Sequence, residues 1–191
     1  MAISLQKGQN VSLDKEAPGM QEIHAGLGWD VQQFAGEDFD LDVVLFLTGA
    51  DGKVLSDHHF IFFNNLTSPD GSVVHSGDNR TGEGEGDDEI INVSLAGVDD
   101  GVQKIVFAVD IHEGPTRSQN FGQVQNAFIR LVDKATNEEM IRYDLSEDFS
   151  IETSVIAAEL YRKDGGWKFK AVGQGFQDGL AALCRHHGVN V

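Results

Sequence analysis

The sequence predicts an all-β protein, a β-sandwich of two mostly antiparallel sheets with a short helix near the C-terminus. Its apolar runs are short, rich in β-branched and aromatic residues, and separated by turn residues. Glycine is frequent, with 22 residues, whereas proline is scarce, with 3. Many short strands at this spacing are typical of a sandwich or a barrel. Nothing marks a boundary between domains, so we expect a single domain over residues 1–191.

The strands are expected, in chain order, at Ile23–Trp29, Leu41–Thr48, Phe60–Phe63, Ile90–Leu95, Lys104–Ile111, Ala127–Val132, Met140–Tyr143, Thr153–Tyr161 and Trp167–Val172. Hairpin turns are predicted by three Asp-Gly pairs, namely Asp51-Gly52, Asp70-Gly71 and Asp164-Gly165. The one good helix candidate is Gln177–His187, because apolar residues recur there at helical spacing and Gly188 can end the helix.

The charge balance is strongly acidic, with 14 Lys and Arg against 31 Asp and Glu, which gives a net charge of -17. This charge repels phosphate backbones and anionic lipid headgroups, and so argues against nucleic-acid binding and direct membrane insertion. Cys184 is the single cysteine, which excludes an intramolecular disulfide and a multi-thiolate metal site. The first residues lack the apolar core of a signal peptide, and no stretch approaches the ~18 apolar residues of a membrane span. The expected location is therefore the cytoplasm.

The carboxylates gather in two segments. The first acidic segment, residues 37–42, leads from a glycine loop into a strand. In an extended chain Asp38, Asp40 and Asp42 share one face, while Phe39 and Leu41 face the core. The second acidic segment, residues 77–89, carries six acids, one Asn and one Thr on a backbone with four glycines. Carboxylates this close repel one another unless a cation or solvent lies between them.

The chemistry that suits these segments is the binding of a hard cation. Calcium takes about 6–8 oxygen ligands in flexible geometry, and glycines let the chain curl so that these oxygens converge. Softer metals prefer thiolate and clustered imidazole, whereas His58 and His59, adjacent on an expected strand, would point to opposite faces. Magnesium fits less well because it requires a near-ideal octahedron. A solvated acidic loop explains one such run equally well, but two runs at the ends of neighbouring strands favour a metal site.

Several motifs only superficially resemble known sites. Residues 78–89 have the length of an EF-hand loop, but Arg80 and Glu83 occupy positions that should hold a ligand and a glycine. The glycine spacing of residues 82–86 is that of a phosphate loop, but its glutamates repel phosphate. The run from Asp40 to Asp42 has the Asp-x-Asp spacing of haloacid-dehalogenase phosphatases without their alternating α/β pattern. Asp110, His112 and Glu113 lie near one strand end, where an ordinary polar loop is favoured over a catalytic or metal role.

Over essentially its whole length, the chain resembles the TerD family. The segments that carry the resemblance are residues 4–13 (SLQKGQNVSL), 26–30 (GLGWD), 39–42 (FDLD), 77–84 (GDNRTGEG), 87–89 (DDE), 126–130 (NAFIR) and 173–176 (GQGF). Residues 54–57, 60–65 and 67–71 look closer to the TerE paralogue. Pro115 departs from the expected pattern in the loop after His112.

This resemblance implies a β-sandwich that binds calcium through clustered acids. It implies a role in resistance to tellurite and other chemical stress, phage and colicins, alongside other tellurium-resistance proteins. Those partners include an integral membrane protein, so the chain is expected to be cytoplasmic and to reach the inner membrane only through partners. Direct reduction of tellurite is not expected, because a lone Cys184 has no resolving thiol.

We predict two calcium ions, because the candidate ligands offer a surplus of oxygens. These ligands are Asp30, Asp38, Asp40, Asp42, Asn64, Asn65, Asp78, Asn79, Glu83, Asp87, Asp88 and Glu89. The preferred hypothesis is a non-catalytic, metal-responsive interaction module. The alternatives are a metal-dependent hydrolase of the phosphoesterase kind that uses the same acidic cluster, and a passive acidic scaffold.

Overall fold

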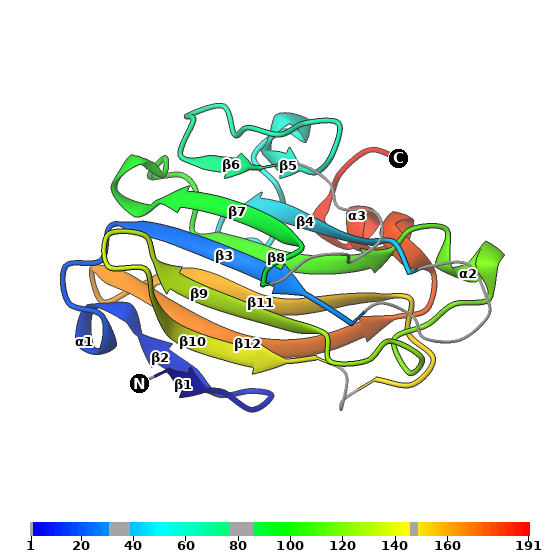
Figure 1. Ribbon diagram of the computed structural model, residues 1–191. Coiled ribbons are helices and arrows are strands. Elements are labelled where there is room, and N and C mark those ends of the chain that lie inside the picture. Colours follow the sequence, from blue (N-terminus) through cyan, green and yellow to red (C-terminus); the bar gives the residue numbers. More distant parts are fainter. Residues whose placement is uncertain (1, 31–38, 77–85, 146–148) are drawn as a thin grey trace.

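The computed structural model describes residues 2–30, 39–76, 86–145 and 149–191. Within these residues the strands form two six-stranded sheets that pack face to face (Figure 1). Sheet A has the order β1 (Ile3–Ser4), β10 (Glu138–Asp144), β9 (Phe128–Asp133), β3 (Glu22–Gly28), β7 (Glu89–Ser94) and β6 (Val73–His75). Sheet B has the order β2 (Asn10–Ser12), β12 (Gly166–Phe176), β11 (Ser154–Lys163), β8 (Lys104–Ile111), β4 (Leu41–Thr48) and β5 (Phe60–Ile61). Neighbouring strands are antiparallel except β1 and β10, which confirms the predicted fold class.

The helices are short: α1 (Leu13–Glu16), α2 (Gly114–Arg117) and α3 (Gly179–His187), with 3-10 turns η1 (Asp57–His59) and η2 (Leu95–Gly97). The predicted C-terminal helix is confirmed as α3, which ends at Gly188 in a left-handed conformation with φ of 76°. Among the described residues, none of the helices has the length and hydropathy needed to cross a membrane.

The core lies between the two sheets, and strand β4 shows how it is built. All eight residues of β4 are buried. Leu45 and its alternate neighbours pack in the core between the sheets, whereas Val44 and Phe46 pack on the outer face of sheet B with Leu183 and Cys184 of α3. Because both faces are covered, Leu41–Thr48 reads as a continuous apolar run instead of an alternating one.

Each predicted Asp-Gly turn lies at a chain reversal. Gly52, Gly71 and Gly165 have φ values of 78°, 73° and 82°, which an L side chain rarely adopts. Asp164 also has a positive φ, 57°, so the β11–β12 hairpin turns on two left-handed residues, as a tight two-residue hairpin requires.

Three strands were not predicted, and one prediction was wrong. Strands β1, β2 and β6 have two or three residues each, too few to show an alternating pattern. The strand expected at Phe60–Phe63 ends at Ile61. His58 and His59 were expected on a strand, but they lie in η1, where the backbone N–H of His59 donates to the carbonyl oxygen of Ser56 and closes a turn.

Candidate metal centre

One end of the sandwich collects carboxylates from both sheets, and several of them are buried. Strand register places Leu27 opposite Glu89 in sheet A, and Asp110 opposite both Asp42 and Ser154 in sheet B. The ends of β3 and β8 therefore lie beside the starts of β7, β4 and β11. We call this region the acidic end, and its described members are Asp30, Asp40, Asp42, Asp87, Asp88, Glu89 and Asp110.

A clamp between the sheets joins the two acidic segments. Strand β5 pairs with β4 at Leu45 and Phe46, so within the part of the chain that the structure describes no strand pairs with β4 at Val43 on that side. The backbone N–H of Val43 instead donates to Oε2 of Glu89 over 2.6 Å, and its carbonyl oxygen lies 3.2 Å from Nε2 of His75. Both clamping side chains come from sheet A and are 1% exposed. Segments that are 46 residues apart are thus held in contact.

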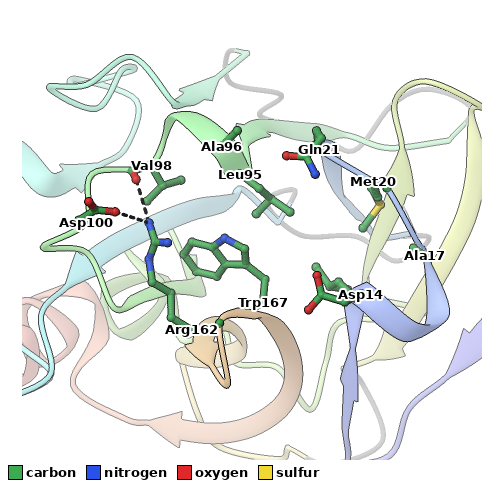
Figure 2. Close-up of a pocket in the computed structure, with 14 residues that line it drawn as sticks. Asp14, Ala17, Met20, Gln21, Leu95, Ala96, Val98, Asp100, Arg162 and Trp167 are labelled. Atoms are coloured by element: carbon green, nitrogen blue, oxygen red, sulfur yellow. Dashed lines mark hydrogen bonds and ion pairs between the residues drawn. The ribbon is translucent and has the colours of Figure 1, made fainter.

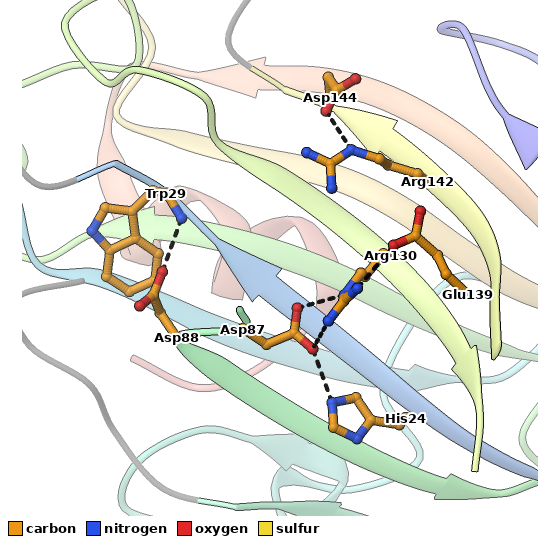
Figure 3. Close-up of polar contacts among 8 residues, drawn as sticks. All are labelled: His24, Trp29, Asp87, Asp88, Arg130, Glu139, Arg142 and Asp144. Carbon is orange, nitrogen blue, oxygen red and sulfur yellow. Dashed lines mark hydrogen bonds and ion pairs between the residues drawn. The ribbon is translucent and has the colours of Figure 1, made fainter. Parts of the chain in front are cut away.

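Asp87 lies on the outer face of sheet A and is neutralised by the protein itself (Figure 3). Its Oδ1 accepts from Nε of Arg130 over 2.7 Å, and its Oδ2 lies 3.1 Å from Nη2 of Arg130 and 3.0 Å from Nε2 of His24. Arg130 also donates to Glu139 over 2.9 Å, and its pKa is raised, mainly by the bond to Asp87. The carboxylate occupies the space above Gly26, where a Cβ atom would lie 2.1 Å from Cγ of Asp87.

Negative charge is crowded where β3 ends. Oδ2 of Asp88 accepts from the backbone N–H of Trp29 over 2.9 Å, and Oδ2 of Asp30 accepts from Nδ2 of Asn126 over 2.5 Å. Burial raises the pKa of Asp88, and the nearby charges of Asp87 and Asp30 raise it further, against the opposing effect of the Trp29 bond. The charges of Asp87 and Asp30 therefore make ionisation of Asp88 harder.

A second buried pair lies on the outer face of sheet B. Asp42 and Asp110 face each other across β4 and β8, and each is 6% exposed. Ser154 donates its hydroxyl to Oδ1 of Asp110, while Oδ2 of Asp42 lies 3.6 Å from Nδ1 of His112. Burial raises the pKa of Asp110 to about 7, although the bonds from Ser154 and from the backbone of Leu180 lower it. Asp110 is therefore partly protonated at neutral pH.

The structure places the described predicted ligands of the two acidic segments, and Asp30 after β3, at one end of the sandwich, but it spreads them over different faces: Asp87 lies on the outer face of sheet A and Asp42 on the outer face of sheet B. Asp40 is 6% exposed, and Phe39 and Leu41 are in the core, as the alternation predicted. Asn64 and Asn65 instead follow β5, where Nδ2 of Asn65 donates to the carbonyl oxygen of Phe60 over 2.6 Å. Four predicted ligands lie outside the described residues: Asp38, Asp78, Asn79 and Glu83.

The described residues alone do not form a complete ligand set. Within residues 2–30, 39–76, 86–145 and 149–191, no three His, Cys, Asp or Glu side chains converge as a metal site requires. The available donors are nonetheless carboxylate and carbonyl oxygens, which is the chemistry that calcium prefers.

Sequence reasoning missed the residues that manage the charge at this end. His24, His75 and Arg130 bind carboxylates through contacts that only the strand register creates. Asp110 was interpreted as part of an ordinary polar loop, but its position on β8 buries it. Glu113 does belong to an exposed loop, where it pairs with Arg117. The one available signal was the alternation of β8, which puts Asp110 on the face of Ala108.

The opposite end of the sandwich holds a cavity of about 270 Å³ beside α1 and the β11–β12 hairpin (Figure 2). Arg162 donates to the carbonyl oxygens of Val98 and Val102 over 2.8 and 3.0 Å, and its guanidinium lies 4.6 Å from the ring centre of Trp167. Trp167 is buried. The guanidinium of Arg162 is already satisfied by backbone carbonyl oxygens. We therefore interpret this cavity as part of the packing that closes this end of the sandwich.

The fold and the acidic end define a class: a β-sandwich protein that gathers carboxylates from both sheets at one end. Comparison with known proteins agrees with this description. The TerD domain matches residues 1–187, and the chain belongs to the TerD family. It is 55% identical to the tellurium resistance protein TerD of Serratia marcescens, over 100% of this chain and 99% of the relative. It is 56% identical to general stress protein 16U of Bacillus subtilis (strain 168), over 100% of both chains.

Solved structures share the fold at lower identity. A protein of unknown function is similar with a TM-score of 0.73 and 25% identity, covering 91% of this chain and 99% of the other. A homologue of the telluride resistance protein TerD from Streptomyces coelicolor A3(2) has a TM-score of 0.70 and 24% identity, covering 86% of this chain and 95% of the other. The family is thus one of tellurium resistance and general stress response.

Proposed function

We propose that this chain is a calcium-binding, non-catalytic interaction module of the stress response. The observation that supports the proposal is the bond between Val43 and Glu89, which holds two acidic segments together at one end of the sandwich. Asp42 and Asp110 lie there as a buried pair directly opposite each other. Like charges in this arrangement are destabilising, and a hard divalent cation would relieve them.

Calcium would draw its ligands from the first acidic segment and from the predicted ligands in residues 31–38 and 77–85. Asp40 and Asp42 are the described candidates in that set. Asp87 has a different role in this proposal, because both of its oxygens already bind Arg130 or His24. It is a positioning residue that fixes the start of β7. The number of ions we propose is two.

Binding would change both stability and surface charge. A ligand that binds only the folded chain raises the free energy of unfolding by mass action. It also converts a repulsive acidic surface into one that can accept a partner. We propose that the partners are other tellurium-resistance proteins, and that the chain reaches a membrane only through them.

The test is thermal unfolding of the intact chain in chelator, in calcium and in magnesium. Calcium is expected to raise the Tm more than magnesium does, and chelator should reverse the gain. The double substitution Asp40→Asn and Asp42→Asn should abolish the calcium effect while it leaves the chelated protein as stable or more stable, because repulsion is removed. Asp164→Asn, the same change in the β11–β12 turn, should keep the full calcium effect. A Tm that ignores calcium would refute the proposal.

One observation favours the second candidate, a metal-dependent hydrolase. Asp110 has a pKa of about 7 and accepts a bond from the Ser154 hydroxyl, so it could transfer a proton near neutral pH. A hydrolase of this kind should turn over a phosphoester in a broad screen, and Asp110→Asn should abolish that turnover. Calcium-dependent stability with no turnover in the screen would leave the interaction module as the function.

A further inference from the structure

A pocket of about 260 Å³ lies on the outer face of sheet B, away from the acidic end. Strand register explains its lining: Thr48 of β4 is opposite Lys104 of β8, and Glu159 of β11 is opposite Lys170 of β12. Helix α3, which packs on this face of sheet B, contributes His187 from its last turn. The pocket is therefore built by four strands and a helix.

The pocket is positively charged, although the whole chain has a net charge of -17. Lys104 has a counter-ion within the pocket, because its Nζ lies 3.3 Å from Oε2 of Glu159. Lys170 has no ion-pair partner among the residues that the structure describes. Two lysines and one glutamate leave one positive charge in a concave site, which favours a negatively charged occupant.

Two residues that line the same pocket, Thr48 and His187, each carry a deeply buried polar atom. Oγ1 of Thr48 and Nε2 of His187 have no hydrogen-bond partner in the described part of the chain. Thr48 is 0% exposed and His187 is 4% exposed. A buried polar atom without a partner costs about 1–3 kcal/mol, so such atoms are normally satisfied by water or a ligand.

The chemistry of His187 narrows the kind of occupant. Nδ1 of the ring lies 3.1 Å from the carbonyl oxygen of Gly52, so Nδ1 carries the proton and donates it. Burial lowers the pKa of His187 to about 4, with the charges of His186, Lys53 and Lys104 adding to this effect. The neutral ring therefore presents Nε2 as an acceptor, which needs a hydrogen atom from its partner.

We propose that this pocket binds a small oxyanion that still carries a proton, of the hydrogenphosphate kind. The anionic oxygens would bind Lys104 and Lys170, and the hydroxyl would donate to Nε2 of His187. Glu159 already accepts from Lys104, so Nε2 of His187 is the acceptor that selects for a proton on the ligand. Sulfate has no such proton at neutral pH, so Nε2 of His187 would face a bare oxygen.

Calorimetric titration of the intact chain in chelator tests the proposal, with phosphate and sulfate as probes. Phosphate is expected to bind with a Kd at least about tenfold lower than sulfate, because sulfate leaves an acceptor unpaired. Tellurite, which is protonated at neutral pH, is the second probe. If phosphate binds, with or without tellurite, the pocket is assigned to protonated oxyanions. The comparison of the two Kd values then shows which of the two oxyanions it prefers. Equal binding of phosphate and sulfate, or no binding of phosphate, overturns the proposal.

Two neighbouring lysines of β12 provide a matched pair of variants. Lys170→Gln should raise the Kd for phosphate at least about tenfold, because it removes a charge-assisted bond. Lys168→Gln makes the same change two residues away, where the side chain pairs with Asp164 and does not line the pocket. It should leave the Kd within about twofold. Equal effects of the two substitutions on the Kd would show that phosphate responds only to the net charge of the protein, and would overturn the assigned pocket.

Thr48→Val separates binding from folding. The substitution keeps the shape of the side chain and removes a buried hydroxyl, so the Tm should stay the same or rise. The Kd for phosphate should nevertheless increase severalfold, because in the proposed complex the otherwise unpartnered Thr48 hydroxyl donates to an anionic oxygen. An unchanged Kd with an unchanged Tm would contradict the assigned pocket.

Discussion

Asp87 and Asp110 are two buried aspartates on opposite sheets of the same acidic end, and they are neutralised in different ways. Asp87 receives three contacts from Arg130 and His24 (Figure 3). Asp110 receives a hydroxyl and a backbone N–H, and it faces another carboxylate, Asp42, across the strand pair. The negative charge of Asp87 is balanced by cations of the fold itself. Asp110, in contrast, must take up a proton or lie near a cation from outside. The two sites should therefore respond oppositely to the same kind of change.

The largest expected effect is the loss of the cation that balances Asp87. Arg130→Met should lower the free energy of unfolding by about 3–5 kcal/mol, because it leaves a buried carboxylate without its main partner. Urea unfolding measures the loss. The matched control is Arg142→Met, which removes a contact with the exposed Asp144 and with the ring of Phe128. That control should cost less than about 1 kcal/mol, and equal losses would contradict the comparison.

The second effect has the opposite sign. The folded-state pKa of Asp110 is about 7, above its usual 3.8, so its protonated form is favoured in the fold. That stabilisation is present in acid and is lost as the pH rises from about 4 through about 7. In chelator, Asp110→Asn should therefore raise the free energy of unfolding at pH 8 by about 2–4 kcal/mol, and by much less at pH 5. Urea unfolding at both pH values measures this, and a loss of stability at pH 8 would show that the buried charge is already compensated.

The smallest effect concerns the second partner of Arg130. Glu139 binds Nη1 of Arg130 over 2.9 Å but is 26% exposed. Glu139→Gln should lower the free energy of unfolding by only about 0.5 kcal/mol, because a solvated ion pair contributes little. If this change cost as much as Arg130→Met, then Glu139 and not Asp87 would be the main anchor of the guanidinium.

The sequence was sufficient for most of the sandwich. Short apolar runs rich in β-branched and aromatic residues, separated by turn residues, located the long strands, and helical spacing located α3. Strands of two or three residues, such as β6, were missed because an alternating pattern needs more residues than they have. The hydrogen bonds that define them depend on neighbours from distant parts of the chain, which no local pattern records.

The sequence predicted which acidic residues belong to the candidate site, but not which contacts each of them makes. The acidic runs identified Asp40, Asp42 and Glu89 as residues of one end. The roles differ because Glu89 clamps Val43 and Asp87 binds Arg130, and both contacts arise from the register of strands far apart in sequence. Little in the sequence indicated that Asp110 is buried, because many apolar strands end in a single polar residue that is exposed.

The central claim is that a cation from outside balances the acidic end of sheet B. An amide NMR titration of the intact chain with calcium tests it most directly. The largest shifts should fall at Leu41–Val43 and near Asp110, with none at the Asp164-Gly165 turn on the opposite end. Shifts spread evenly over both ends, or no shifts at saturating calcium, would contradict it.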